Sequence, residues 1–426
     1  MSRGVKHTTY LLVGFSVAAW WAARSIRLHD PGGKILAVSE EEGPYSRPLI
    51  TYVLGERVPD ATYWGEVLRT QDVEVIWNSR VVHLDPRTKA AILSSGEKIV
   101  FEKALIATGS VPVVPPIGGS KLEGIFTLTR RSDVDALKTY LKGVAGRNVL
   151  IIGGGFIGLK ACEALLDLGL EVTVVELAPR LLSGMLDDLG SRYLERALEE
   201  HGVRVMTGDT VQTFVGCGNR VVGAELKSGT FVNADAVIVA VGVRPCIDWL
   251  RDSGILLGRG VIVNERQETS CEGVFAAGDV AETRHLITGD RTVVAIWPEA
   301  VRQGKVAGKN MAGVQAVYPG SLPMNVIEVG NVTLASCGLA NPQEGDYVTL
   351  AKEKKGWYRK CVLLGEHLVG CILFGDIERV GIFVHLIRER VPVSSFRDKL
   401  LEDNFGLVAL PLAYRKHLIL EAGVEV

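Results

Sequence analysis

The sequence predicts an α/β protein with two Rossmann-like domains followed by a C-terminal α+β domain. Residues 8–40 and 148–176 share one plan, in which an apolar strand, a glycine turn and a helix lead to a second strand that ends in acid. A later strand completes each unit and ends in a similar tripeptide, ATG at 107–109 and AVG at 240–242. The internal duplication of one supersecondary pattern therefore predicts two copies of one fold.

Length and composition fit several independent cores and exclude some functions. The 426 residues suffice for two or three domains, and 47% apolar and 23% charged residues are ordinary values for a globular protein. A formal net charge of -2 without a Lys/Arg-rich run gives no support for a nucleic-acid partner. Any charged surface that attracts a partner must therefore be local.

The apolar run at 10–23 follows Arg3 and Lys6 and is similar in length to a secretory signal. It is shorter than the roughly 20 residues that a spanning helix needs. The following segment, GGKILAVSEEE, is a second strand ending in acid, so we expect a βαβ unit here. We accordingly expect no membrane contact and a cytoplasmic location.

Seven cysteines, the first of them Cys162, form no C-x-x-C motif and have no clustered histidines. We therefore predict no metal site. The expected state of these cysteines is buried and apolar in a reducing compartment, without disulfides.

The second glycine loop, NVLIIGGGFIGLK, carries Gly153, Gly155 and Gly158 in the pattern G-x-G-x-x-G, directly after a strand and before a helix. The first glycine permits the tight turn, the second admits a pyrophosphate and the third allows the helix to pack closely. Glu176 ends the next strand and is expected to bind an adenosine ribose, which favours NADH over NADPH. Arg180, nearby, is expected to soften that preference.

The first loop, VGFSVAAWWAAR, follows the same plan with fewer glycines. Gly14 keeps the turn, Ser16 and Ala19 stand at the other two positions, and Glu40 is the corresponding ribose acceptor. The alternative is a decayed loop that binds nothing. Whether this loop can bind a nucleotide depends on its bulky neighbours Phe15, Trp20 and Trp21. Their side chains need room beside the phosphates or in the packing behind them.

Two later segments favour a second nucleotide. Asp279, in AAGD after an apolar strand, suits hydrogen bonding to a polyol such as the ribityl chain of FAD, although it is also a candidate helix N-cap. The segment WPEAVRQGKVAGKNM predicts a helix over 298–311 with Pro298 in its first turn. The positive end of that helix would stabilise negative charge on a reduced flavin.

Together these motifs resemble the FAD-dependent pyridine nucleotide-disulfide oxidoreductase superfamily over essentially the whole chain. PYSRPLITYVLGE, FEKALIATGSVPVVPP, YPGSLPMN and LVGCILFGDIERVGIF are similar to the NADH:rubredoxin and ferredoxin reductase branch, including the FAD–NAD oxidoreductases associated with carbon monoxide dehydrogenase. The resemblance implies an FAD domain at 1–116 and 243–320, an NAD domain at 117–242 and a C-terminal interface domain at 321–426 that forms a homodimer.

The resemblance also implies the ligand contacts. The residues implied to contact FAD are Gly14, Ser16, Ala19, Glu40, Arg47, Pro48, Val81, Thr108, Gly109, Asp279 and Trp297. Those implied to contact NAD are Gly153, Gly155, Phe156, Ile157, Gly158, Glu176 and Gly242.

Departures from the family pattern narrow the chemistry. The segment PYSRPLITY has no cysteine where disulfide reductases carry theirs, so thiol-relay chemistry is not expected. His385 is followed by Arg390 instead of a catalytic glutamate and is interpreted as a helix-face histidine. Tyr52 and Lys160 replace a Lys–Glu pair of the ferredoxin reductases. Our hypothesis is that Lys160 supplies positive charge near flavin N5, and the alternative is a lysine on the solvent side of a helix.

The expected function is NADH-dependent electron transfer, by hydride transfer to flavin N5, to a small iron–sulfur or rubredoxin-type protein, or the reverse. One alternative is an NADH oxidase that produces hydrogen peroxide. The other is a non-catalytic subunit that has lost FAD and keeps NAD binding.

Overall fold

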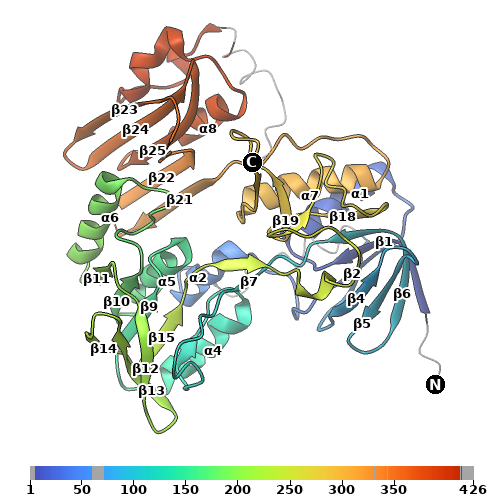
Figure 1. Ribbon diagram of the computed structural model, residues 1–426, viewed down its shortest axis with the longest axis horizontal. Helices are drawn as coiled ribbons and strands as arrows, with labels where there is room; N and C mark the ends of the chain where they lie inside the picture. Colours follow the sequence, from blue (N-terminus) through green and yellow to red (C-terminus); the bar gives the residue numbers. More distant parts are fainter. Residues whose placement is uncertain (1–4, 60–71, 331, 343, 413, 415–426) are drawn as a thin grey trace.

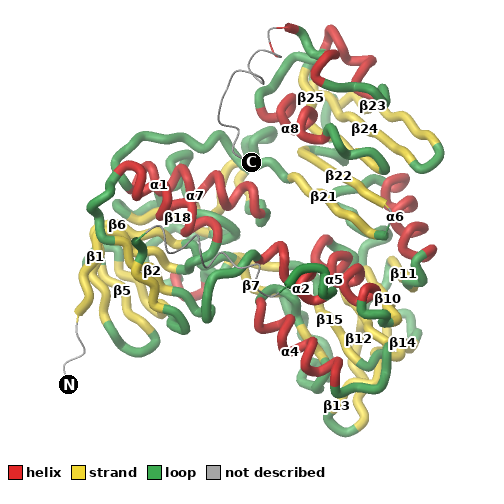
Figure 2. Tube along the Cα trace, turned by 180° about the vertical axis from the view of Figure 1, so that it is seen from behind, coloured by secondary structure: helices red, strands yellow, loops and turns green. Residues whose placement is uncertain are grey.

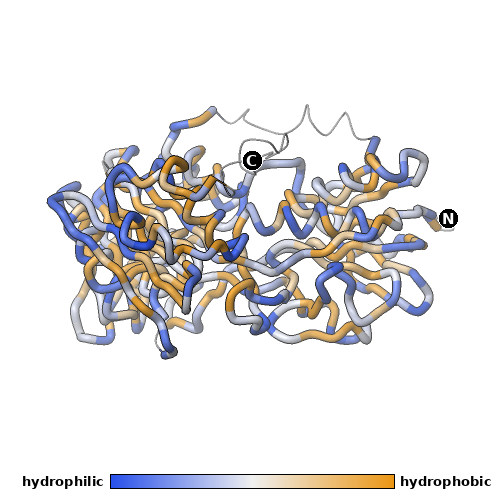
Figure 3. Tube along the Cα trace, turned by 90° about the horizontal axis from the view of Figure 1, so that it is seen from above, coloured by the Kyte–Doolittle hydropathy of each residue, from blue (hydrophilic) through white to orange (hydrophobic). Residues whose placement is uncertain are grey.

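The computed structural model describes residues 5–59, 72–330, 332–342, 344–412 and 414. The chain forms three bodies, two built on sheets whose central strands are parallel and one on an antiparallel sheet (Figure 1). The tube coloured by hydropathy shows apolar and polar segments interleaved along the chain (Figure 3).

The first body contains a sheet in the order β3-β2-β1-β6-β5-β4, with β18 added beside β6. The central strands β1, β2, β6 and β18 are mutually parallel neighbours, as a dinucleotide-binding fold requires. The segment after residue 273 thus returns to the sheet that the first hundred residues form. The strands are β1 Val5–Val13, β2 Ile35–Val38, β3 Glu74–Ile76, β4 Val81–Asp85, β5 Ala90–Leu93, β6 Lys98–Ile106 and β18 Val274–Ala276.

Two helices, α1 (Val17–His29) and α7 (Trp297–Met311), lie side by side on this sheet (Figures 1 and 2). They approach closely because a Cβ atom at Gly304 would lie 2.2 Å from the carbonyl oxygen of Ala18. Gly308 meets Ala22 one turn later in the same way. The helix predicted over 298–311 is confirmed, beginning one residue earlier. The apolar run at 10–23 is divided between a strand and a helix, and no described helix is long and apolar enough to cross a bilayer.

The second body repeats the plan with a five-stranded sheet in the order β11-β10-β9-β15-β8 and a three-stranded sheet β12-β13-β14 beside it. The strands are β8 Ile125–Phe126, β9 Asn148–Ile152, β10 Glu171–Glu176, β11 Arg204–Thr207, β12 Val211–Cys217, β13 Arg220–Leu226, β14 Phe231–Asn233 and β15 Ala236–Val239. The helices are α4 Arg131–Lys142, α5 Phe156–Asp167 and α6 Asp188–Glu200.

The chain passes between the two bodies through a pair of short antiparallel strands, β7 (Ser110–Pro112) and β16 (Val243–Pro245). The segment at 110–112 is therefore one half of a two-stranded crossing. The smaller elements of this part of the chain are the 3₁₀ helices η1 Arg47–Leu49 and η2 Asp248–Leu250, α2 Ile50–Leu54, and strands β17 Val261–Ile262, β19 Ala281–Arg284 and β20 Arg291–Thr292.

The third body is an antiparallel sheet in the order β21-β22-β25-β24-β23. One face shares a core with the second body through residues such as Ile327, Tyr358 and Phe374, and the other face is covered by α8 with Phe383 inward. The C-terminal sheet is thus fixed to the second body by apolar packing. The elements are β21 Met324–Val329, β22 Val332–Gly338, β23 Tyr347–Lys354, β24 Trp357–Leu364, β25 His367–Phe374, α8 Val380–Arg388, η3 Ser394–Leu401 and η4 Leu407–Ala409.

Candidate functional site

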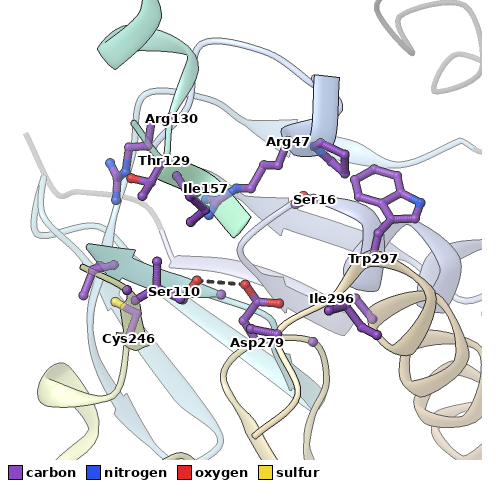
Figure 4. Close-up of a pocket in the computed structure, with 18 of the residues that line it drawn as sticks. Ser16, Arg47, Ser110, Thr129, Arg130, Ile157, Cys246, Asp279, Ile296 and Trp297 are labelled. Atoms are coloured by element: carbon purple, nitrogen blue, oxygen red, sulfur yellow. Dashed lines mark hydrogen bonds between the residues drawn. The ribbon is translucent and has the colours of Figure 1, made fainter. Parts of the chain in front are cut away.

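A cavity of about 1430 Å³ lies between the bodies, and all three contribute to its wall. Its wall includes the amino ends of α1, α5 and α7 and the start of β21. Small-molecule sites usually occupy about 300–1,000 Å³, so this cavity has room for more than one ligand. Figure 4 shows one part of it, where side chains from the first body and from 129–157 converge.

The first glycine loop has the backbone that its sequence predicts. Gly14 adopts a left-handed φ of +89°, and a Cβ atom there would lie 2.3 Å from the carbonyl oxygen of Ala107. Ser16 is the N-cap of α1 and makes no side-chain cap hydrogen bond. Its hydroxyl is therefore not committed to the helix end. Ala19 is fully buried and does not line the cavity, so it acts in helix packing.

The bulky side chains after Gly14 do not fill the loop. Phe15 borders the cavity but is only 6% exposed, and its ring lies 6.0 Å from that of Trp77 in an edge-on contact. Trp20 and Trp21 pack edge to face, with centroids 4.8 Å apart, and neither lines the cavity. Phe15 and Trp20 are therefore in the packing behind the predicted phosphate site, whereas Trp21 is half-buried farther out, with Arg24 and Lys305 against its ring.

The second loop reproduces the same turn. Gly153 has φ +107°, and a Cβ atom there would lie 2.4 Å from the carbonyl oxygen of Ala240. A side chain at Gly158 would meet the Gly153 carbonyl at 2.0 Å, whereas Gly155 has nothing within 4 Å of its missing Cβ. Gly155 thus leaves open space at the amino end of α5, where a phosphate group can approach the backbone.

The two predicted ribose acceptors are held differently. The Glu176 carboxylate accepts hydrogen bonds from the backbone N–H groups of Gly154 (2.6 Å) and Ala178 (2.7 Å), which fixes it against the second loop. Glu40 forms ion pairs with Arg80 (2.8 Å) and Arg130 (3.2 Å). Arg130 comes from the second body, so a charged contact between the bodies lies at the residue predicted to bind the first ribose.

Arg180 does not line the cavity and forms an ion pair with Asp188 at 3.0 Å. The expected softening of the NADH preference by this arginine therefore has no contact to support it.

Asp279 lies at the centre of the region that Figure 4 shows, where its carboxylate accepts a hydrogen bond of 2.8 Å from Ser110. The next element is the strand β19, so the N-cap alternative for Asp279 is wrong. The adjacent Gly278 N–H donates to the Gln303 side chain at 2.8 Å. Because Gln303 belongs to the second turn of α7, this hydrogen bond joins the AAGD turn to that helix.

A buried carboxylate anchors the amino end of α7. Glu299 is fully buried and accepts hydrogen bonds from Arg302 (3.0 Å), Tyr318 and Arg388 of α8. Burial, followed by the charge of Glu299, raises the pKa of Tyr318, which keeps this hydroxyl protonated. The helix end that faces the cavity is thereby connected to the C-terminal body.

Lys160 and Tyr52, which the sequence pairs, are in contact. Lys160 is 7% exposed, and its Nζ lies 3.2 Å from the Tyr52 hydroxyl and 2.7 Å from Glu163. The alternative of a solvent-facing lysine is therefore wrong. Arg57 also binds Glu163, so the carboxylate faces two cations. A Lys–carboxylate pair is thus present at the cavity wall, but both partners come from one turn of α5.

All but two of the predicted residues border the cavity; the exceptions, Ala19 and Gly158, act in helix packing. Those that border it are Gly14, Ser16, Glu40, Arg47, Pro48, Tyr52, Val81, Thr108, Gly109, Gly153, Gly155, Phe156, Ile157, Lys160, Glu176, Gly242, Asp279 and Trp297.

Residues that the sequence did not indicate also line the cavity. They are Arg80, Ser110, Arg130, Cys246, Trp249 and Asn325 among others. The prediction that the cysteines are uniformly buried is wrong, because Cys217 is exposed and Cys246 and Cys271 are half-buried. Burial raises the pKa of the Cys246 thiol, which disfavours the thiolate. No local motif marks these residues, because their position depends on how the bodies meet.

His385 lies half-buried on α8 and does not line the cavity.

Two glycine turns opening on helix ends, two carboxylates at the positions predicted to bind ribose and one shared cavity fit a dinucleotide-dependent flavoprotein oxidoreductase. Residues 8–304 match the family described as pyridine nucleotide-disulphide oxidoreductase, and residues 323–391 match the rubredoxin NAD⁺ reductase C-terminal domain. The chain belongs to the pyridine nucleotide-disulphide oxidoreductase family, whose members use FAD and NAD(P)H. It is an NAD(P)H-dependent oxidoreductase of that family.

Several known proteins are similar over most of their length. Subunit epsilon of NADH-dependent phenylglyoxylate dehydrogenase from Aromatoleum evansii is 33% identical over 98% of this chain and 99% of its own. The NADH-rubredoxin oxidoreductase of Clostridium acetobutylicum is 28% identical over 88% of this chain and 92% of its own. The crystal structure of the NADH:rubredoxin oxidoreductase from that organism matches with a TM-score of 0.74 and 26% identity, over 93% of this chain and 99% of its own.

Proposed function

We propose that this protein transfers electrons between NAD(H) and a small iron–sulfur or rubredoxin-type carrier through FAD. The observation that carries the proposal is the cavity wall around Lys160, where Tyr52 lies beside the ammonium group and where the described residues include no thiol; Glu163 binds the same ammonium group from behind the wall. Cys246 is the thiol that lines the described part of the cavity. The charges of Glu40 and Arg130 act on it, so it lies near the position proposed for the FAD ribose. A single-electron carrier requires no thiol relay.

The domains that we assign are an FAD domain at 1–116 and 243–320, an NAD domain at 117–242 and an interface domain at 321–426. FAD would be held by the first loop, Glu40, the segment at 108–110, Asp279 and the amino end of α7. NAD would be held by the second loop, Glu176 and Gly242. When bound, FAD accepts a hydride from NADH and releases the two electrons singly.

The residues of this chain provide position and electric field. Gly14 and Gly153 open the turns so that backbone N–H groups at two helix ends face the phosphates. The buried Glu299 contacts fix the amino end of α7, whose dipole favours a negatively charged ligand edge. Lys160 adds one positive charge at the cavity wall, and Tyr52 and Glu163 hold its ammonium group in place.

The role of Lys160 is tested by Lys160→Met. Loss of the charge should lower the flavin potential and slow flavin reduction by NADH about tenfold, equivalent to about 1.4 kcal/mol. Stopped-flow absorbance and redox titration measure the two effects, and Tyr52→Phe is the matched control that keeps the charge. An unchanged potential and an unchanged reduction rate in Lys160→Met would eliminate this role.

The function itself is tested by steady-state NADH oxidation on protein of known flavin content. We expect much faster turnover with rubredoxin or a [2Fe–2S] ferredoxin than with oxygen. Faster turnover with oxygen, with peroxide formed, would instead establish the oxidase alternative, which is supported by 31% identity to an NADH oxidase of Methanocaldococcus jannaschii over 77% of this chain and 75% of the relative. A colourless protein that takes up no added FAD would establish the non-catalytic subunit.

The reverse direction is a second candidate. Its support is the similarity to subunit epsilon of a dehydrogenase named as NADH-dependent, which favours a subunit that delivers electrons to NAD⁺ inside a larger complex. Reduction of NAD⁺ by dithionite-reduced ferredoxin measures it. We further propose a homodimer, to be measured by light scattering, and a cytoplasmic location, since the described cysteines are all free.

A further inference from the structure

The outer face of the α1–α7 layer carries positive charge around one tryptophan. The residues of this α1–α7 surface are Trp21, Arg24, Arg302, Lys305 and Lys309. The sequence of α1 contains no Asp or Glu, and the acid of α7, Glu299, is fully buried and bound by two arginines. The described outer face of these two helices is therefore cationic, although the whole chain has a net charge of -2.

Trp21 contacts cations from both helices of this surface. The Lys305 Nζ lies 4.0 Å from the centroid of its ring, and the guanidinium carbon of Arg24 lies 4.9 Å from it. Cation–π contacts of this kind hold a cation against the face of the ring. The two cations are thus ordered in advance by an aromatic ring, which lowers the entropy cost of presenting them to a partner.

The α1–α7 surface lies close to the cofactor cavity. Both helices begin at the cavity wall, α1 at Ser16–Val17 and α7 at Ile296–Trp297. Lys305 is eight residues beyond Trp297, which corresponds to about 12 Å along a helix. A partner bound here would therefore stand within about three helical turns of the cavity.

We propose that the α1–α7 surface docks a small acidic electron-carrier protein, with Trp21 as the central anchor and Arg24 and Lys305 as its charged neighbours. This proposal rests on the function proposed above, because it names where that carrier binds. Tryptophan and arginine dominate the energetic centres of protein interfaces, and a complementary charge mainly accelerates encounter. The surface has four cations, one of them bound to Glu299, which are too few to follow a nucleic-acid backbone in a chain of negative net charge.

The experiment uses the FAD-loaded protein, rubredoxin and a [2Fe–2S] ferredoxin as carriers, and benzoquinone as a small uncharged acceptor. Arg24→Gln/Lys305→Gln should raise KM and Kd for the carriers at least about threefold and flatten their salt dependence. Trp21→Ala should raise Kd about 30-fold. Turnover with benzoquinone should stay unchanged in both variants. Lys227→Gln, an exposed lysine on the hairpin of the second body, is the matched control with wild-type values.

The outcomes separate the two proposals. Carrier turnover that is the same in all variants would overturn the docking surface and leave the proposed function intact. Carrier binding by calorimetry that the variants weaken, without any carrier turnover in the wild type, would overturn the function and support the surface. If the wild type binds neither carrier, or binds duplex DNA more tightly than either, the docking proposal is wrong. Arg24→Gln/Lys305→Gln keeps the test valid if Trp21→Ala fails to fold.

Discussion

The two glycine loops of this protein make the same backbone turn but secure the following helix differently. Gly14 and Gly153 both adopt left-handed φ values, and both face a carbonyl oxygen, of Ala107 and Ala240 respectively. In the second unit Gly158 lets α5 pack against its own loop, because a Cβ atom there would meet the loop carbonyl at 2.0 Å. The corresponding residue of the first unit, Ala19, carries that carbon and is fully buried.

The first unit has its close-packing glycines on another helix. Gly304 and Gly308 of α7 admit the backbone of α1 at distances that no side chain would allow. The first loop lacks the third glycine of the motif. Glycines almost 300 residues later in the chain provide the close helix packing instead. The first glycine of each loop is needed because the backbone there has a left-handed φ. The third glycine is needed only for close helix packing, and glycines of another segment can provide that packing.

The largest expected effect comes from the first glycines. Gly14→Ala adds about 1–2 kcal/mol of left-handed strain and a clash with Ala107. We expect purified Gly14→Ala to lack flavin absorbance. Gly153→Ala should keep its flavin but bind NADH at least about 30-fold more weakly by calorimetry. A yellow Gly14→Ala protein with wild-type FAD affinity would contradict the equivalence of the two turns.

The second effect tests the compensation by α7. Gly304→Ala places a carbon against Ala18 and should lower the free energy of unfolding by about 1–3 kcal/mol, with weaker FAD retention. Thermal unfolding followed by flavin fluorescence measures both. The control is Gly381→Ala in α8, where the added carbon meets nothing within 4 Å and helix propensity improves. Equal melting temperatures for the two variants would contradict the idea that glycines of α7 allow its close packing on α1.

The two units also differ in how a carboxylate connects them to the C-terminal body. Glu299 of the first unit binds Arg388 of α8. Asp187, the N-cap of α6 in the second unit, binds the Tyr358 hydroxyl at 2.6 Å and Lys360 at 3.1 Å. Burial opposes the charge of Asp187, but the hydrogen bonds from Tyr358 and the helix end outweigh it and lower its pKa.

The smallest expected effect follows from that shift. A pKa lowered by folding means that the unfolded chain binds the proton first, so the stabilisation is present above about pH 4 and is lost as pH falls through the folded value. Asp187→Asn should therefore reduce the acid dependence of unfolding, with a loss of about 1 kcal/mol at neutral pH from the weaker cap and contacts. Denaturant unfolding between pH 3 and 7 measures it. Parallel pH profiles for variant and wild type would contradict the assignment.

Much of the fold and the cavity wall is local in origin and was predictable. The alternation of apolar strands with glycine turns predicted both parallel sheets, and the sequence after residue 297 predicted α7 to within one residue. Gly14, Gly153 and Asp279 were recognisable because each follows directly on a strand that must end at the cavity edge.

Other features of the cavity depend on contacts between distant segments. The burial of Lys160 requires Tyr52 from the first body and the Glu328 carbonyl from the third. Arg130 and Cys246 reach the cavity only because the two crossings of the chain bring the bodies together. The hydrophobic period of a sequence indicates which side of its own strand or helix each residue lies on. It does not indicate which side of that element another body covers.

The sequence by itself determined the two strand–turn–helix units, the glutamates after them and the absence of a cysteine in the segment at 44–52. These follow from backbone sterics and from the period of apolar residues, which act within a few residues. Only the tertiary structure decided that Phe15 and Trp20 pack behind the first loop, and that the glycines which let a helix approach α1 closely come from α7. Close packing is a relation between surfaces, and it is fixed only when both surfaces have folded.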